Sequence, residues 1–105
     1  MKLASTIMIN FINAKKQADN LDAAAKQLRR IADSGIENSL QELSAAWKGE
    51  ASDAYCRKGR ELKGKILATA KKTEREADVI RNAARRTYNA EMTAYNLAIK
   101  RLYKK

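Results

Sequence analysis

The sequence predicts an all-α protein, an antiparallel two-helix hairpin of coiled-coil character that pairs with another hairpin into a four-helix bundle. Pro is absent, and the residues that favour long helices are abundant. Apolar residues recur at steps of three and four in both halves of the chain. Trp47 and Gly49 stand near the middle of the 105 residues, where a turn would lie. We expect one domain over residues 1–105, with arm one at about 4–46, a turn at about 47–50 and arm two at about 51–103.

Arm one carries a heptad stripe of which half the members are Ala, namely Ile7, Phe11, Ala14, Ala18, Leu21, Ala25, Leu28 and Ala32. The stripe then shifts by an extra four-residue step and continues through Ile36, Leu40, Leu43 and Trp47. Asp33-Ser34-Gly35 lies at this shift. We expect the helix to continue through it with a local bend. The alternative is a true break, which would give three helices.

The turn is predicted from Trp47 and Gly49. Gly49 supplies the backbone freedom that a chain needs just past a helix end. Trp47 is expected to bring the largest apolar side chain to the place where the two arms close on each other. Glu50 and Asp53 would lie in the first turn of arm two, where the helix dipole favours negative charge.

Arm two has the longer stripe, which consists of Ala51, Tyr55, Gly59, Leu62, Ile66, Ala70, Thr73, Ala77, Ile80, Ala84, Tyr88, Met92, Tyr95, Ile99 and Leu102. Gly59 falls on this stripe, where a missing side chain permits close approach of arm one. Two alternatives stay open for the far end of the stripe. Either another chain covers it, or Ile7 and Phe11 of arm one do.

Charge separates the two halves of the chain. Residues 1–50 carry seven basic and six acidic side chains, whereas residues 51–105 carry fifteen basic and six acidic ones. Arm two therefore presents either a solubilising face or a surface for an acidic protein. Nucleic acid or an anionic membrane surface is the less favoured partner, because no base-reading motif or aromatic-interleaved basic patch is visible.

The sequence offers little for catalysis. His is absent, Cys56 is the one cysteine, and no Gly-rich phosphate loop or nucleophile elbow occurs. We therefore expect a non-enzyme without a cofactor or bound metal. The sequence contains no run of eighteen apolar residues, so we expect no membrane-spanning helix. Asn10 and Asn13 interrupt the apolar N-terminal stretch, so we expect synthesis in the cytoplasm without a cleaved signal peptide.

Trp47-Lys48-Gly49, set in Leu43-Ser44-Ala45-Ala46-Trp47-Lys48-Gly49-Glu50-Ala51 and followed by Ala54-Tyr55, resembles the turn of the WXG family of small helical hairpins. The resemblance covers nearly the whole chain in architecture and about a dozen residues in motif. It implies a protein of type VII secretion, which acts as a secreted substrate or as a partner or targeting adaptor for a larger secreted toxin. The implied complex is a homodimer or a heterodimer with another helical chain, such as the helical N-terminal region of that toxin.

Members of that family often carry a Tyr followed four positions later by Asp or Glu, as part of an export signal. This chain departs from the motif, because Met92 follows Tyr88 and Ile99 follows Tyr95 at that spacing. The nearest approximation is a degenerate signal of Tyr88 with Glu91, which share one helix face. The alternative is a core Tyr beside a surface acid. The expected partner-binding residues are Tyr88, Met92, Tyr95, Ile99, Arg85 and Arg86.

Overall fold

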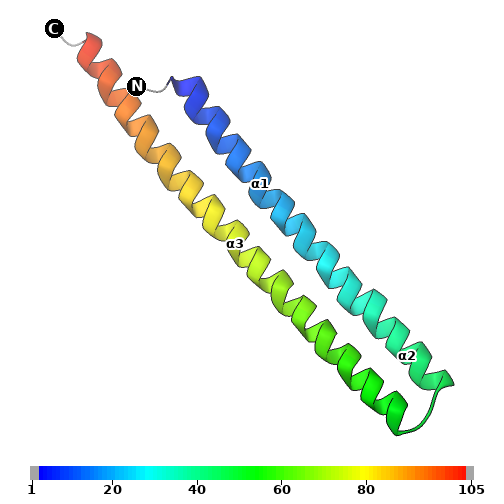
Figure 1. The fold of residues 1–105 in the computed structure, drawn as a ribbon. Helices are drawn as coiled ribbons and strands as arrows, with labels where there is room; N and C mark the ends of the chain where they lie inside the picture. Colours follow the sequence, from blue (N-terminus) through cyan, green and yellow to red (C-terminus); the bar gives the residue numbers. More distant parts are fainter. Residues whose placement is uncertain (1–2, 104–105) are drawn as a thin grey trace. The chain divides into compact units, whose positions relative to one another are not determined.

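The computed structural model describes residues 3–103, and within that range it contains helices and no strand (Figure 1). The elements are α1 (Ala4–Arg30), the π-helical turn η1 (Ile31–Ile36), α2 (Glu37–Ala46) and α3 (Glu50–Tyr103). The predicted all-α class is confirmed, with two long helical stretches joined by a bend at residues 47–49. Pairing with a second hairpin stays a prediction.

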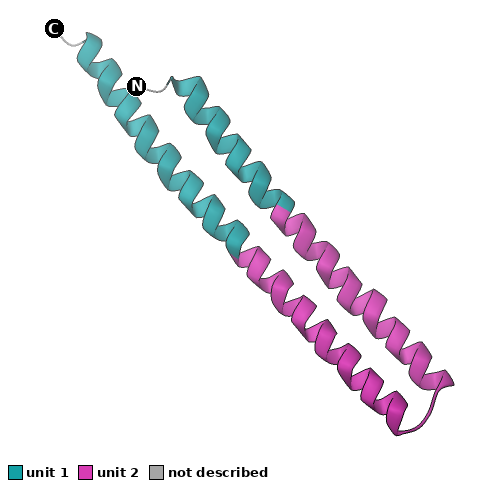
Figure 2. Cartoon of the chain, viewed as in Figure 1, with its two compact units in different colours: residues 1–20, 76–105 teal, residues 21–75 magenta. Residues whose placement is uncertain are grey.

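The chain divides into two compact units, which Figure 2 colours separately. Unit 1 comprises residues 1–20 and 76–105, and unit 2 comprises residues 21–75. Unit 2 contains the bend. Each unit consists of residues that precede the bend in the sequence and residues that follow it. The units are described separately below.

The core of unit 2 is built mainly from small side chains. Ala25 and Ala32 of arm one are fully buried, and Leu40 is 4% exposed. From α3, Ser52, Cys56 and Ala70 are also buried. Small side chains let two helices approach closely, but each removes little apolar area from water. The hairpin is therefore held by a close seam that contributes modest burial energy.

Gly59 creates the closest approach within unit 2. A Cβ atom built on Gly59 would lie 2.6 Å from Cδ2 and 2.8 Å from Cδ1 of Leu40. The side chain of Leu40 thus occupies the space that any other residue at position 59 would fill. The role that the sequence predicts for Gly59 is confirmed. The neighbouring Gly64 has nothing within 4 Å of the same position.

Arm one passes through Asp33-Ser34-Gly35 without a break, as a π-helical turn. The flanking residues Arg30 (φ −63°, ψ −43°) and Glu37 (φ −63°, ψ −44°) keep α-helical backbone angles. Such a turn accommodates one residue more than an α-helix does. The interval of eight residues between buried Ala32 and buried Leu40 is one residue longer than a heptad, so both side chains face α3. The alternative of three separate helices is wrong.

The bend is closed by backbone hydrogen bonds. Trp47 is the last residue bonded to α2, since its N–H donates to the carbonyl of Leu43 over 2.8 Å. Its own backbone is extended, with φ −126° and ψ 119°. Gly49 has φ +120°, a conformation that other residues rarely adopt, and its carbonyl accepts from Asp53 N–H at 3.0 Å. The positive φ predicted for Gly49 is therefore present.

Unit 1 holds two antiparallel helical segments together by an aromatic contact and an ion pair. The rings of Phe11 and Tyr88 lie with centroids 4.8 Å apart. Farther along, Arg81 donates to Asp19 at 2.7 Å, so residue numbers rise on one segment as they fall on the other. Among the residues of this unit that the structure describes, the buried side chains are Ile7, Ala18 and Ala77.

Candidate partner-binding surfaces

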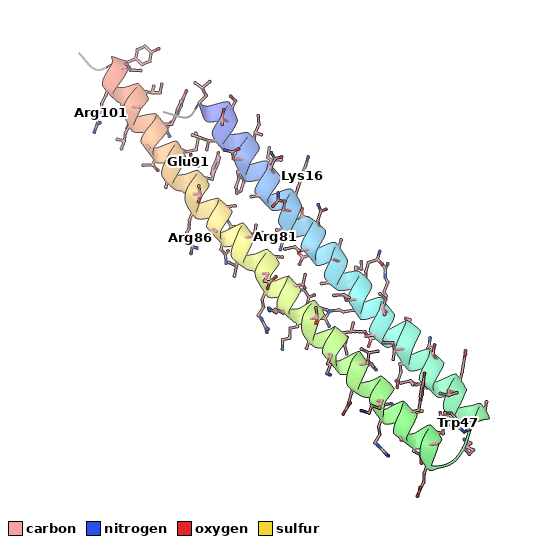
Figure 3. The ribbon with its side chains drawn as sticks, in the orientation of Figure 1. Lys16, Trp47, Arg81, Arg86, Glu91 and Arg101 are labelled. Carbon is pink, nitrogen blue, oxygen red and sulfur yellow. The ribbon has the colours of Figure 1, made fainter. Side chains whose placement is uncertain are left out.

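Trp47 lies at the surface of the bend, as Figure 3 shows. Its side chain is 42% exposed, and its ring centroid is 6.2 Å from that of Tyr55. The expectation that Trp47 fills the space between the arms is wrong, because the chain leaves the helix before it and turns its side chain outward. Ser52 occupies the inner position instead. It is 1% exposed and its hydroxyl donates to the carbonyl of Trp47 over 2.6 Å.

An apolar groove of about 730 Å³ runs along one side of unit 2. Its walls come from η1, α2 and the beginning of α3. Several large apolar side chains in it are half exposed, including Ile31 at 50%, Tyr55 at 58% and Leu62 at 52%. The lining residues are Ile31, Gly35, Ile36, Ser39, Leu40, Leu43, Tyr55, Lys58, Gly59 and Leu62.

The position of Tyr55 and Leu62 differs from the prediction. Both belong to the apolar stripe expected to face arm one, yet Cys56 and Ser52 occupy the inner seam. Small side chains fit where the two backbones are close, so the larger apolar ones are displaced to the flank. The sequence pattern thus contains more apolar surface than the seam between the arms uses.

The opposite flank of unit 2 is ionic. Glu37 lies 3.7 Å from Arg60 and 3.9 Å from Lys63, and Lys63 lies 3.9 Å from Asp33. One oxygen of Glu37, Oε2, is buried without a hydrogen bond and depends on these two cations for its neutralisation.

A fork of two hydrogen bonds from the Arg29 guanidinium to the Glu74 carboxylate adds a fourth contact on that flank. The hydrogen bond with Glu74 and its negative charge raise the pKa of Arg29 above its usual value. Arg29 therefore stays charged at any pH that the protein meets.

Unit 1 holds the residues that the sequence assigns to export and partner binding. Tyr88 packs on Phe11, so arm one covers it, and it lines with Glu91 a second groove of about 300 Å³. Met92, Tyr95 and Ile99 are half-buried, and both Arg85 and Arg86 are exposed. Figure 3 labels Arg86 and Glu91 on α3. Tyr88 and Glu91 share a groove, but a role in export stays a prediction.

Beyond these positions, Leu102 is 66% exposed. Arm one thus covers Tyr88 through Phe11, whereas coverage of the exposed Leu102 by another chain stays a prediction.

Reactive chemistry is sparse in the part of the chain that the structure describes. Cys56 is 5% exposed, with its sulfur 4.0 Å from the carbonyl oxygen of Leu40. Across residues 3–103, no three side chains of His, Cys, Asp or Glu are grouped so as to hold a metal ion. None of the helices in that range combines the length and apolar character needed to cross a membrane.

Comparison with known proteins found no matching family model, no matching curated protein and no matching solved structure.

Proposed function

We propose that the protein is a non-enzymatic helical hairpin of type VII secretion, either a secreted substrate or a partner and targeting adaptor for a larger secreted toxin. The observation that carries the proposal is the open apolar groove of unit 2, set beside a bend that carries Trp47 and Gly49. A second helical chain would complete the fold of that unit by covering the groove.

The composition of the core supports a partner. The seam of unit 2 contains Ala25, Ala32 and Ala70, whose methyl groups bury little area. Larger side chains such as Ile31 and Leu62 remain half exposed. Since small two-helix folds rarely bury enough surface alone, association with another hairpin into a four-helix bundle is the natural way to cover them.

The bend supports the link to secretion. The resemblance to the WXG family rests on Trp47-Lys48-Gly49, and the exposed indole at the bend is available to a recognising protein. Tyr88 and Glu91 are the candidates for a second recognition element in unit 1. Export of this chain would then depend on a secretion ATPase and on both elements, or on those of a partner.

Deletion of the secretion ATPase in the source cell tests this function. We expect the protein to disappear from the culture medium and to accumulate in the cell, or, for an adaptor, the toxin to disappear while this chain stays inside. A cytoplasmic enzyme measured in the same fractions controls for lysis. Unchanged distribution of both this chain and every large secreted protein in the deletion strain would refute the proposal.

The excess positive charge of α3 favours a second candidate, a module that binds an anionic surface. Residues 51–105 carry fifteen basic and six acidic side chains, which gives this half of the chain a net charge of +9. Binding to random-sequence duplex DNA would then persist at about 0.15 M salt and weaken steeply as salt rises, by roughly 0.9 logarithmic units per phosphate contacted. Weak binding at that salt concentration would favour the secretion function.

A further inference from the structure

We propose that the groove of unit 2 binds an acidic amphipathic helix. The apolar stripe of that helix would pack on Ile31 and Leu62, and its carboxylates would pair with Lys58, Lys65 and Lys72. This inference rests on the proposed function and names the chemistry of the partner.

The two flanks of α3 are opposite in character. Successive helical residues are about 100° apart around the axis. Since Gly59 faces Leu40, Lys58 and Arg60 must lie on opposite sides of the seam. Lys58 lines the groove, and Arg60 pairs with Glu37 at 3.7 Å. The groove therefore lies on the flank that the intramolecular ion pairs leave unused.

Arm one repeats the same arrangement. Ala32 is fully buried in the seam. Ile31 before it lines the groove, and Asp33 after it lies 3.9 Å from Lys63 on the ionic flank. Both arms of unit 2 thus place apolar side chains on one flank and ionic ones on the other. A second apolar face of this kind is expected for a hairpin that packs against a third helix.

A lysine borders the groove, and two more lysines continue its row along α3 beyond the groove. Lys58 is the charged residue among those described as lining it. Lys65 and Lys72 follow at intervals of seven along α3, so they lie on the same flank two and four turns farther on. The ion pairs described in unit 2 include those of Arg29, Arg60 and Lys63, and none of Lys58, Lys65 or Lys72. The row of Lys58, Lys65 and Lys72 is thus left without a carboxylate partner.

The positive charge of this row of lysines decides which kind of helix can bind in the groove. A second copy of the chain, with a net charge of +10, would bring the same lysines toward each other across a two-fold axis. An incoming helix with Asp or Glu beside its apolar stripe would instead neutralise them, as charged flanking positions do in coiled coils. The complementary occupant is therefore an acidic helix.

The proposal is tested with two synthetic helical peptides. Each is about 21 residues long, which is three heptads, and both carry the same stripe of Leu and Ile. One carries Glu at every position that flanks the stripe, and the other carries Lys there. Binding of each to the fluorescently labelled full-length protein is measured by anisotropy at low salt. We expect the Glu peptide to bind at least about tenfold more tightly than the Lys peptide.

Matched variants locate the binding. Leu62→Asp should reduce the affinity for the Glu peptide at least tenfold, whereas Val79→Asp, at another exposed apolar position of α3 (64% exposed), should not. The double variant Lys58→Glu/Lys72→Glu should abolish the preference for the Glu peptide. The control Arg57→Glu/Lys71→Glu makes the same charge change at the same spacing, but one residue earlier and away from the groove. It should retain most of the preference for the Glu peptide. Circular dichroism checks that each variant stays helical.

Several results would overturn the inference. They are equal affinity for both peptides, no binding of the Glu peptide at about 1 mM, or equal losses in the two double variants. Self-association that Leu62→Asp removes would identify a second copy as the occupant and would also overturn it. None of these results affects the export test in the ATPase deletion strain, so the two proposals fail separately.

Discussion

Substitution of Gly59 by Ala tests how closely the arms of unit 2 are packed. In an open helical position, Gly→Ala stabilises a protein by about 1 kcal/mol because Ala has the higher helix propensity. At Gly59 the new methyl group would lie 2.6 Å from Leu40 Cδ2, closer than any real contact of this kind. Leu40 is only 4% exposed, so its side chain can move away only toward the groove that it lines, at the expense of its packing in the seam. Such overpacking costs about 1–3 kcal/mol.

Gly64→Ala is the matched control, since both glycines lie within α3 and Gly64 has nothing within 4 Å. We expect Gly64→Ala to stabilise the protein by about 1 kcal/mol. Gly59→Ala should be less stable than Gly64→Ala by about 1–3 kcal/mol, because propensity cancels between them and the overlap remains. Urea unfolding followed by far-UV circular dichroism measures both. Equal stabilisation by the two variants would show that the seam is looser than described here.

The substitution Leu40→Ala tests whether the destabilisation by Gly59→Ala comes from steric overlap with the Leu40 side chain. In the wild-type background it should cost about 2–5 kcal/mol, as expected for a buried Leu. In the Gly59→Ala background it should cost less, by roughly the 1–3 kcal/mol of relieved overlap. Additive effects of the two substitutions would contradict direct contact between positions 40 and 59.

Three further substitutions probe the bend and unit 1. Ser52→Ala removes the buried hydrogen bond to the carbonyl of Trp47 and should destabilise by about 1–2 kcal/mol in urea unfolding, whereas Ser44→Ala, on an exposed local bond, should change little. Trp47→Ala should cost only about 1–2 kcal/mol, and iodide should quench the indole fluorescence of the native protein; a loss above about 3 kcal/mol would place the ring in the core. Phe11→Ala removes the ring packed on Tyr88 and should cost roughly 2 kcal/mol, with faster amide exchange on both segments of unit 1; unchanged exchange there would contradict the contact.

Periodicity predicted the helices well, since the structure has helix over Ala4–Ala46 and Glu50–Tyr103 beside predicted arms of 4–46 and 51–103. The role of Gly59 also followed from its place on the stripe. Periodicity did not locate the seam within a wide apolar face, because residues one position apart differ by only about 100°. Near the bend the choice between Tyr55 and Cys56 was decided by size, and the smaller side chain lies inside.

Trp47 shows a second reason why the sequence was insufficient. Its large apolar area predicted burial, but the residue lies past the last helical position, where the extended backbone directs its side chain away from the seam. Ser52, a polar residue that the pattern did not mark, fills the inner position because its hydroxyl donates a hydrogen bond to the carbonyl of Trp47. Local backbone geometry of this kind is not encoded in hydrophobic spacing.

The π-helical turn at Ile31–Ile36 makes arm one tolerant to the loss of one residue. A strict heptad helix that gains one residue rotates every later side chain away from its partner helix. Here the extra residue is confined to a single wide turn, and Ala32 and Leu40 on its two ends both remain in the seam. Loss of one residue from Asp33-Ser34-Gly35 would restore a seven-residue interval as plain α-helix. Deletion of a single residue at this point is therefore the change in length that the hairpin is best able to survive.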